Sequence, residues 1–390
     1  MSTTNDRVES LLASGRAVEA VAILEPEARL KPGSFEVWHC LGRAYGQAGR
    51  LADAEKAFGA AVRLRPDLHD AHYNLALTLA YQDKLAEAAA HFAQARKIDP
   101  RNPEFQKTLF PILVTLLQRS GEAGPPLAAK LGPLAARPLV SVVVPTLNRP
   151  RMLRDALESV ARQGYEKWEA IVANDGGGDV SPVVEALPGT ARAKIRQIRL
   201  PETRGPAAAR NAAIAVAQGD VLAFLDDDDF HAPTHLEGLV AGLRASGAGM
   251  AYAAAELVQE TLKDGKRLET ARRPFLPGLR YSRPLLLVRN YIPINTWGVR
   301  REGFAVAGAF DEALHYLEDW DFLLRLSARF DVHQMTEVTA EYRVTPETGD
   351  SVTKRHQHSQ AVHSFYRRHD ASGLPWVGLA RELYLESLGA

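Results

Sequence analysis

Four consecutive aspartates at residues 226–229 are the strongest chemical signal in this sequence of 390 residues. They follow the apolar run 221–225, which is short enough for a buried strand rather than a helix. Adjacent carboxylates beside an apolar core repel one another and raise one another's pKa unless a cation offsets the charge. Mg²⁺ and Mn²⁺ prefer oxygen ligands and often bridge carboxylates to phosphates. The run therefore predicts a divalent metal site, although taken alone it also fits a solvated acidic loop.

Asp175 is a second candidate, because it follows the apolar run 168–173 and precedes three glycines, residues 176–178. A flexible glycine backbone could let a nucleotide approach closely. The same Asn-Asp-Gly sequence is also typical of a simple turn. A third acidic group, Glu318, Asp319 and Asp321, precedes an apolar helical stretch, where acids in the first turn complement the helix dipole.

The elements that must position these acids alternate between strands and helices. We expect strands at 139–146, 168–173, 194–200 and 221–225, with helices at 150–163 and 206–218 between them. This order predicts a doubly wound, mostly parallel sheet covered on both faces. Ligands of such sheets bind beyond the carboxyl ends of the strands. After the aspartates we expect a helix at 231–246 and strands at 250–258 and 260–269, with a turn at 264–265.

Six motifs in this half of the chain occur in the order found in family 2 glycosyltransferases with the GT-A fold. They are residues 140–149 (VSVVVPTLNR), 172–176 (VANDG), 204–211 (RGPAAARN), 224–229 (FLDDDD), 308–312 (GAFDE) and 318–321 (EDWD). Each motif alone is weak, but their order over residues 139–345 resembles that family specifically. The resemblance implies a nucleotide sugar as donor, with UDP as the expected nucleotide.

The resemblance also implies roles for individual residues. The aspartate at 175 would contact the uracil ring, and the arginine at 210 would bind phosphate or base oxygens through its planar fork of donors. The helix that begins after Gly205 would itself favour an anion at its N-terminus. The expected nucleotide-sugar site comprises Pro145, Thr146, Asn148, Asp175, Arg210, Asn211, Asp226 and Asp227.

Asp226 and Asp228 match the Asp-x-Asp element that binds Mn²⁺ or Mg²⁺ in the resembling family. We expect Asp226 to touch the ribose as well and Asp228 to hold the ion, which would act as a Lewis acid on the leaving diphosphate. Asp319 matches the general base of an inverting transfer, which removes the acceptor's proton. Glu318, Asp229 and Trp320 are expected to support the site, although Trp320 is equally typical of a core residue.

One departure from the pattern concerns the segment 341–344 (EYRV), which is often followed by a histidine near the diphosphate, whereas Thr345 follows here. His356 and His358 lie farther on and could replace it. The same stretch, rich in Lys and Arg, also fits a polar helical face, which we favour because no acidic or cysteine partner completes a zinc pattern.

The first third of the chain repeats every 34 residues. Small residues recur at Ala20, Ala54 and Ala88, and prolines recur at Pro32, Pro66 and Pro100. This resembles the tetratricopeptide repeat, whose antiparallel helix pairs stack into a concave surface that usually holds a peptide or protein. A helical stretch at 102–119 would cap the stack. The repeats either dock a partner or only rigidify the enzyme or mediate self-association.

These patterns predict an all-helical repeat solenoid followed by a Rossmann-like GT-A domain. The expected boundaries are 1–119 for the repeats, 120–138 for a Gly-, Ala- and Pro-rich linker, 139–350 for the transferase and 351–390 for a helical extension.

The overall composition limits the partners of the chain. The 47 basic residues equal the 47 acidic ones, so no global charge favours nucleic acid or an anionic membrane. Cys40 is the single cysteine and fits a reducing compartment. Residues 1–6 are polar, and no apolar run approaches the length of a membrane span. We therefore expect a cytoplasmic protein without an integral membrane segment.

Three functions remain open at this stage. The leading hypothesis is an inverting, metal-dependent transferase that acts on a protein or peptide docked by the repeats. The second keeps the transferase but makes the acceptor a glycan or lipid-linked saccharide. The third is a binding scaffold that has lost activity, which the intact acids disfavour. Nucleotidyl transfer is more distant, because related sheets also bind nucleoside triphosphates.

Overall fold

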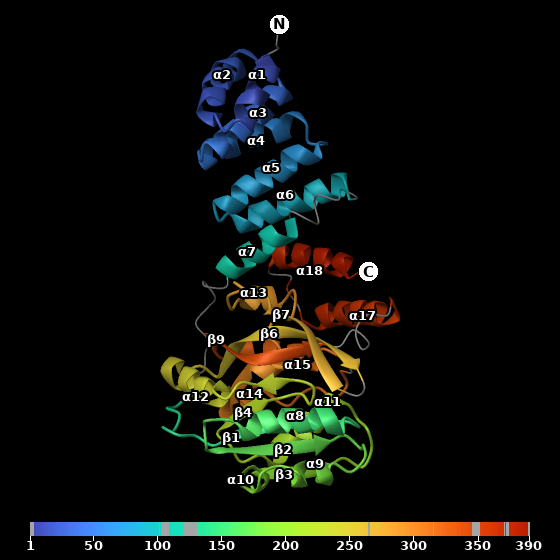
Figure 1. The fold of residues 1–390 in the computed structure, drawn as a ribbon. Helices are drawn as coiled ribbons and strands as arrows, with labels where there is room; N and C mark the ends of the chain where they lie inside the picture. The colour runs from blue at the N-terminus through green and yellow to red at the C-terminus, as the bar shows by residue number, and fades with distance from the viewer. Residues whose placement is uncertain are drawn as a thin grey trace. The chain divides into compact units, whose positions relative to one another are not determined.

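A computed structural model describes residues 4–100, 102, 109–120, 131–263, 266–314, 316–344, 352–369, 371 and 374–388. The chain forms two compact units. The first comprises residues 1–119 and 370–387, and the second comprises residues 120–369 and 388–390. Each unit is described separately below (Figure 1).

The first unit is entirely helical in its described part. Its first six helices form antiparallel pairs along the chain: α1 (Thr4–Ala13), α2 (Ala17–Leu30), α3 (Phe35–Gln47), α4 (Leu51–Leu64), α5 (His69–Tyr81) and α6 (Leu85–Ile98).

The 34-residue period has a clear structural origin in the turns and in the helix crossings. Gly15, Gly49 and Asp83 lie in the turns that join the paired helices and have positive φ angles of 74°, 74° and 59°. Gly42 permits a close crossing, because a Cβ atom there would lie 2.7 Å from the ring of Phe58. The tetratricopeptide architecture predicted from the sequence is therefore confirmed.

Two further helices complete this unit, α7 (Phe110–Ser120) and α18 (Pro375–Ser387). The α18 helix packs on α6, and Glu382 and Glu386 both pair with Arg96. The ring of Tyr384 stacks on Phe110 at a centroid distance of 6.2 Å. The segment expected as one extension at 351–390 thus contributes a helix to each unit, because α17 (Val352–Arg368) belongs to the second.

The second unit is built on a mixed nine-stranded sheet with the order β3-β2-β1-β4-β8-β6-β9-β5, and β7 pairs with β6. The strands β1, β2, β3 and β4 are parallel, whereas β8 joins antiparallel to both β4 and β6. The bounds are β1 (Val140–Thr146), β2 (Trp168–Asn174), β3 (Ile195–Arg199), β4 (Val221–Phe224), β5 (Phe230–His231), β6 (Met250–Lys263), β7 (Lys266–Pro274), β8 (Trp297–Arg300) and β9 (Val332–Val344).

Helices cover both faces of this sheet. They are α8 (Pro150–Ala161), α9 (Ser181–Glu185), α10 (Gly189–Arg192), α11 (Pro206–Val216), α12 (His235–Ser246), α13 (Arg283–Leu286), α14 (Arg301–Ala307) and α15 (Glu318–Ser327), with a 3₁₀ turn, η3 (Ile294–Thr296). Residues of α8, α9 and α12 form one buried cluster with alternate residues of β1, β2 and β4, including Val142 and Val144.

The opposite face of the sheet packs through aromatic rings. Phe224 at the end of β4 makes edge contacts with Trp297 of β8 and with Phe310. Phe322 of α15 contacts Phe310 and stacks on Trp297. This cluster fixes α15, which carries the acidic group at 318–321, beside the strand that precedes the four aspartates. The predicted GT-A-like fold is confirmed, with a larger antiparallel part than the sequence indicated.

Candidate active site

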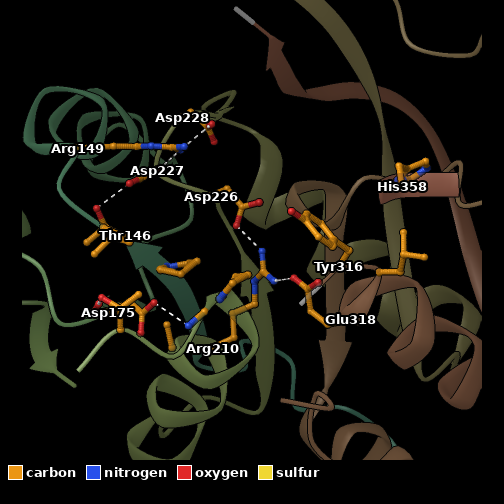
Figure 2. A pocket seen from close by; sticks show the side chains of 17 residues that line it. Thr146, Arg149, Asp175, Arg210, Asp226, Asp227, Asp228, Tyr316, Glu318 and His358 are labelled. Atoms are coloured by element: carbon orange, nitrogen blue, oxygen red, sulfur yellow. Dashed lines mark hydrogen bonds and ion pairs between the residues drawn. The ribbon is translucent and has the colours of Figure 1, made fainter. Parts of the chain in front are cut away.

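The carboxyl ends of β1, β2 and β4 border a pocket of about 580 Å³ (Figure 2). Parallel strands present these ends at the same edge of a sheet, which is where ligands of such folds bind. The predicted residues that line it are Pro145, Thr146, Asp175, Arg210, Asp226, Asp227, Asp228, Glu318 and His358.

Residues 226–229, here called the aspartate loop, are held in place by hydrogen bonds from residues in and just after β1. Thr146 Oγ1 donates to Asp227 Oδ2 at 2.7 Å, and Arg149 Nη1 lies 3.2 Å from Asp227 and 3.0 Å from Asp228. Burial raises the pKa of Asp227 to about 6 and also raises that of Asp228. The loop thus gathers carboxylates whose charged form is costly without a cation.

Asp229 takes a different role from its neighbours. It is buried, and its carboxylate accepts the backbone N–H of Arg343 at 2.8 Å. Burial raises the pKa of Asp229 well above its ordinary value. Asp229 therefore ties the loop to β9 and borders a second pocket rather than the first.

Arg210 connects the aspartate loop to the acidic helix α15. Its side chain is only 4% exposed, and its two terminal nitrogens donate to Asp226 and to Glu318, each at 2.7 Å. The arginine reaches this position because Gly205, with a φ of 93°, allows α11 to begin immediately after the β3 loop. Figure 2 shows this bridge across the pocket. Glu318 is therefore a buried ion-pair partner, beyond the dipole role that its place in the first turn suggests.

Asp175 organises the loop that follows β3. Its two carboxylate oxygens accept the backbone N–H groups of Arg204 at 2.9 Å and Gly205 at 2.8 Å. The neighbouring glycine at 176 has a φ of 80°, and a Cβ there would lie 2.7 Å from the backbone of Glu202. The Asn-Asp-Gly segment therefore makes a turn and also presents Asp175 to the pocket, so both sequence interpretations fit the same geometry.

Asn148 and Asn211 do not line this pocket. Asn148 has a φ of 55°, and its Oδ1 accepts the backbone N–H of Gly178 at 2.9 Å. The side chain of Asn211 bonds to both backbone groups of Phe310 and to Glu312. Each asparagine shapes a pocket loop from behind, and direct contact with a nucleotide sugar stays a prediction.

Asp319 lies in the adjoining pocket of about 360 Å³, which shares Arg210, Asp226 and Glu318 with the first. Asn290 Nδ2 donates to Asp319 Oδ2 at 3.0 Å, and the backbone N–H of Trp320 donates to Oδ1 at 2.7 Å. Burial, followed by the nearby Glu318 carboxylate, raises the pKa of Asp319 to about 7. Such a carboxylate is suited to proton transfer near neutral pH.

Trp320 has the core role rather than a ligand-facing one. It is 2% exposed, its Nε1 donates to Leu286 O at 2.6 Å, and its ring stacks on Phe365 of α17 at 4.2 Å. On the same helix turn, Asp321 accepts from His369 at 3.0 Å and from Arg325 at 2.8 Å. The helix α15, which carries Asp319, is thus packed against α17.

The helix α17 also brings His358 to the first pocket, where it is partly exposed. The side chain of His356, the other candidate on this helix, lies outside the described residues, as does Thr345. A role for either histidine at the diphosphate remains a prediction.

The carboxylates around the first pocket form a partial set of ligands for a divalent ion. Among the residues that the structure describes, no three His, Cys, Asp or Glu side chains are placed to hold an ion. Asp226 and Asp228 both line the open pocket and offer the hard oxygen ligands that Mn²⁺ and Mg²⁺ prefer. This set fits an ion that takes most of its ligands from substrate phosphates and water, the usual arrangement for Mg²⁺ with nucleotides.

Two residues at the site were not among the sequence candidates. Arg149 is part of the first motif, so its position after the β1 strand was a usable signal. Asn290 ends the stretch 273–290, which has no periodic pattern, and only its position in the fold brings it to Asp319.

Comparisons with known proteins agree with this geometry. Residues 141–306 match the model for glycosyl transferase family 2, and residues 41–103 match a tetratricopeptide repeat model. The chain is 32% identical over 212 residues to the uncharacterized glycosyltransferase YwdF of Bacillus subtilis, covering 54% of this chain and 76% of that protein. The chain therefore belongs to the family 2 glycosyltransferases.

Two further relatives extend the comparison. The putative colanic acid biosynthesis glycosyl transferase WcaA of Escherichia coli is 27% identical over 60% of this chain and 81% of its own length. The mannosyltransferase PcManGT of Pyrobaculum calidifontis, solved with GDP-Man and Mn²⁺, has a TM-score of 0.51 at 18% identity, covering 72% of this chain and 79% of its own. The latter likeness concerns the fold. In the described part of the chain, no helix is both long and apolar enough to cross a bilayer.

Proposed function

We propose that this chain transfers a hexose, with inversion, from a UDP-sugar to an acceptor hydroxyl. The observation that carries the proposal is the pair of adjoining pockets that share Arg210, Asp226 and Glu318. The first pocket contains the aspartate loop, which offers ligands for a metal-bound diphosphate, and Asp175, which would face the nucleoside. The adjoining pocket contains the buried carboxyl group of Asp319. A donor and an acceptor bound in the two pockets would meet where they join.

In this mechanism Asp319 accepts the proton of the attacking hydroxyl while Asn290 and the backbone of Trp320 hold its carboxylate in one orientation. Arg210 pairs with both Asp226 and Glu318 and so holds the aspartate loop beside α15. A Mn²⁺ or Mg²⁺ ion bound by Asp228 and Asp226 would neutralise charge on the leaving diphosphate as a Lewis acid. Asp175 and Thr146 border the space for the nucleotide.

Calorimetric titration of UDP and GDP with and without Mn²⁺ tests the donor site. We expect UDP to bind the wild type only with the ion, and Asp228→Ala to abolish this binding. Asp311→Ala, which removes an acid outside the pocket, is the control and should bind normally. A structural relative binds GDP-Man with Mn²⁺, so tight GDP binding with weak UDP binding would overturn the nucleotide assignment while preserving the transferase.

For the acceptor we propose a protein or peptide docked by the repeats, in the cytoplasm. The support is the stacked helix pairs of the first unit, which in such repeats form a peptide-binding surface. The single Cys40 fits a reducing compartment.

A glycan acceptor is the second candidate, and the name of the colanic acid relative favours it. Screening acceptors separates the two. The first candidate is supported if the chain glycosylates a protein and this activity is lost when residues on the concave surface of the repeats are replaced. Transfer to saccharides that is unaffected by those replacements supports the second.

A further inference from the structure

A third concave surface lies beside the first pocket, between the first turns of α8 and the hairpin of β6 and β7. It is a groove of about 800 Å³ and includes Arg149, Arg151, Arg154 and Arg267 along its walls. We propose that this groove binds an anionic segment of a glycan, bearing carboxylate or phosphate groups, next to the sugar-transfer site. The identification of the ligand as a glycan rests on the transferase function proposed above, with the glycan acceptor that stands there as the second candidate.

The charge of the groove is unusual for this chain. The whole sequence has equal numbers of acidic and basic residues, whereas the groove presents four guanidinium groups and one carboxylate, that of Asp155. The acids that pair with Arg149 and Arg267, which are Asp227, Asp228 and Glu260, do not line the groove. An anion in the groove would therefore face guanidinium groups, because the carboxylates of these ion pairs lie outside the lining.

Two of these arginines, Arg149 and Arg267, are held by hydrogen bonds without any ligand. Arg267 donates to Glu260 at 2.6 Å and to the backbone oxygen of Asp228 at 2.5 Å, and only 11% of its side chain is exposed. Its Nη1 lies 4.0 Å from Asp155 and has no hydrogen-bond partner in the part of the chain that the structure describes. A ligand oxygen that reached this nitrogen after a small shift would satisfy it.

The other two arginines, Arg151 and Arg154, are exposed and lie three positions apart on α8, so their side chains project from the same face of the helix. Guanidinium groups bind carboxylates and phosphates through paired donors, so exposed and fixed arginines together could bind successive anionic groups of a chain.

The shape and position of the groove favour a glycan. A flat bilayer surface cannot enter a concave groove. Met152, Leu262 and the apolar stems of the arginines provide contacts for the C–H faces of sugar rings. Arg149 lines both the groove and the nucleotide pocket, so a saccharide in the groove would lie directly beside the donor. An acidic peptide is the competing occupant and is included in the test.

The test uses the full chain and compares Arg151→Glu/Arg154→Glu with the wild type. Its matched control, Arg192→Glu/Arg329→Glu, makes the same change of charge at exposed sites of the same unit outside the groove. The probes are a uronic acid oligosaccharide, a glycerol phosphate oligomer, a neutral glucan oligomer and an oligoglutamate peptide of similar length. Binding is measured by calorimetry at low and high salt.

We expect at least one anionic saccharide to bind the wild type, to bind the groove variant at least tenfold more weakly, and to bind the control as it binds the wild type. The neutral oligomer should bind at least tenfold more weakly than the anionic one, and salt should weaken anion binding because it screens the charges. The two anionic probes distinguish carboxylate from phosphate recognition.

Three results would overturn the proposal: no anionic saccharide binding by the wild type, equal losses in the groove and control variants, or tighter binding of the oligoglutamate peptide. Arg151→Gln/Arg154→Gln provides a milder variant if charge reversal disturbs folding. UDP binding with Mn²⁺ is measured in every variant and should be unchanged. If the wild type does not bind UDP, this result counts against the transferase proposal alone, because saccharide binding to the groove is measured without a nucleotide.

Discussion

At the scale of single residues, the carboxyl group of Asp319 has the environment expected of a proton acceptor. We predict that Asp319→Asn lowers kcat by about 10²- to 10⁴-fold, the usual contribution of a general base, while UDP binding is retained. Asp321→Asn on the same helix turn is the control and should keep most activity, since Asp321 faces Arg325 and His369. Steady-state kinetics with parallel calorimetry provides the measurement. Full activity in Asp319→Asn would exclude this residue as the base.

The pH profile of the reaction gives an independent test of the same residue. Burial raises the pKa of Asp319 to about 7, so the proton-accepting form decreases as the pH falls below that value. We therefore predict that kcat falls about tenfold per pH unit below 7 and reaches a plateau above it. A rate that is constant between pH 5.5 and 8 would contradict this prediction.

The stability of the folded chain should depend on Arg210, because this residue is a buried cation between two acids. Replacement by methionine leaves Asp226 and Glu318 without their partner and should cost about 3–5 kcal/mol in the free energy of unfolding. Arg204→Met removes a half-exposed pair with Glu312 and should cost less than about 1 kcal/mol. Urea unfolding of both variants measures the difference, and similar costs would show that burial does not strengthen the Arg210 contacts.

Sequence analysis could predict the acidic residues of the site because each follows a recognisable strand or begins a recognisable helix. Asp175, Asp226, Asp227 and Asp228 all lie in the first pocket, as their motifs imply. Asn290 could not be predicted, since its relation to Asp319 depends on the path of a loop that carries no periodic signal. The engagement of Asn211 with Phe310 could not be predicted either, because it joins residues 99 positions apart.

At the scale of elements, the contact of β5 with α12 contains two stacked, buried histidines. The ring centroids of His231 and His235 lie 3.9 Å apart. Burial lowers the pKa of His231 to about 4 and lowers that of His235 well below its ordinary value. Their neutral forms are therefore favoured in the folded state, whereas the unfolded chain binds protons below about pH 6.5.

The stability that these histidines allow is fully present above pH 6.5 and is lost as the pH falls towards 4. For His231 alone the loss is about 3 kcal/mol over this interval. We predict that the decrease in unfolding free energy between pH 7.5 and 5 is smaller in His235→Leu than in the wild type. The exposed His363→Gln serves as the control and should follow the wild type. Equal slopes in all three proteins would refute this account.

Sequence analysis missed two longer-range strands of the sheet, β8 and β9. The strand β8 is only four residues long and contains a glycine, and β9 mixes buried and exposed residues without strict alternation. Neither pattern separates a strand from a loop, because the burial of both strands depends on their partners in the sheet. The parallel strands were predictable because β1 and β4 are buried along their entire length.

At the scale of the whole molecule, the helix α18 stabilises the repeat unit although it lies at the other end of the chain. Leu383 of α18 is 2% exposed, and this helix packs on α6. We predict that Leu383→Asp lowers the stability of the repeat unit by about 2–5 kcal/mol and increases hydrogen exchange in α6, while UDP binding is unchanged. Ser387→Asp, which introduces the same charge at an exposed position of α18, is the control. Unaltered exchange in α6 would contradict the assignment of α18 to this unit.

The division of the chain also has a consequence for biosynthesis. The transferase unit lies in sequence between α7 and α18, so all its strands leave the ribosome before the last helix of the repeat unit does. Domains generally fold in order of synthesis. Here the second unit can fold while the first still lacks α18 and exposes the apolar surface of α6 that this helix covers. Chaperones that recognise such surface would therefore encounter the repeat unit until α18 has been synthesised.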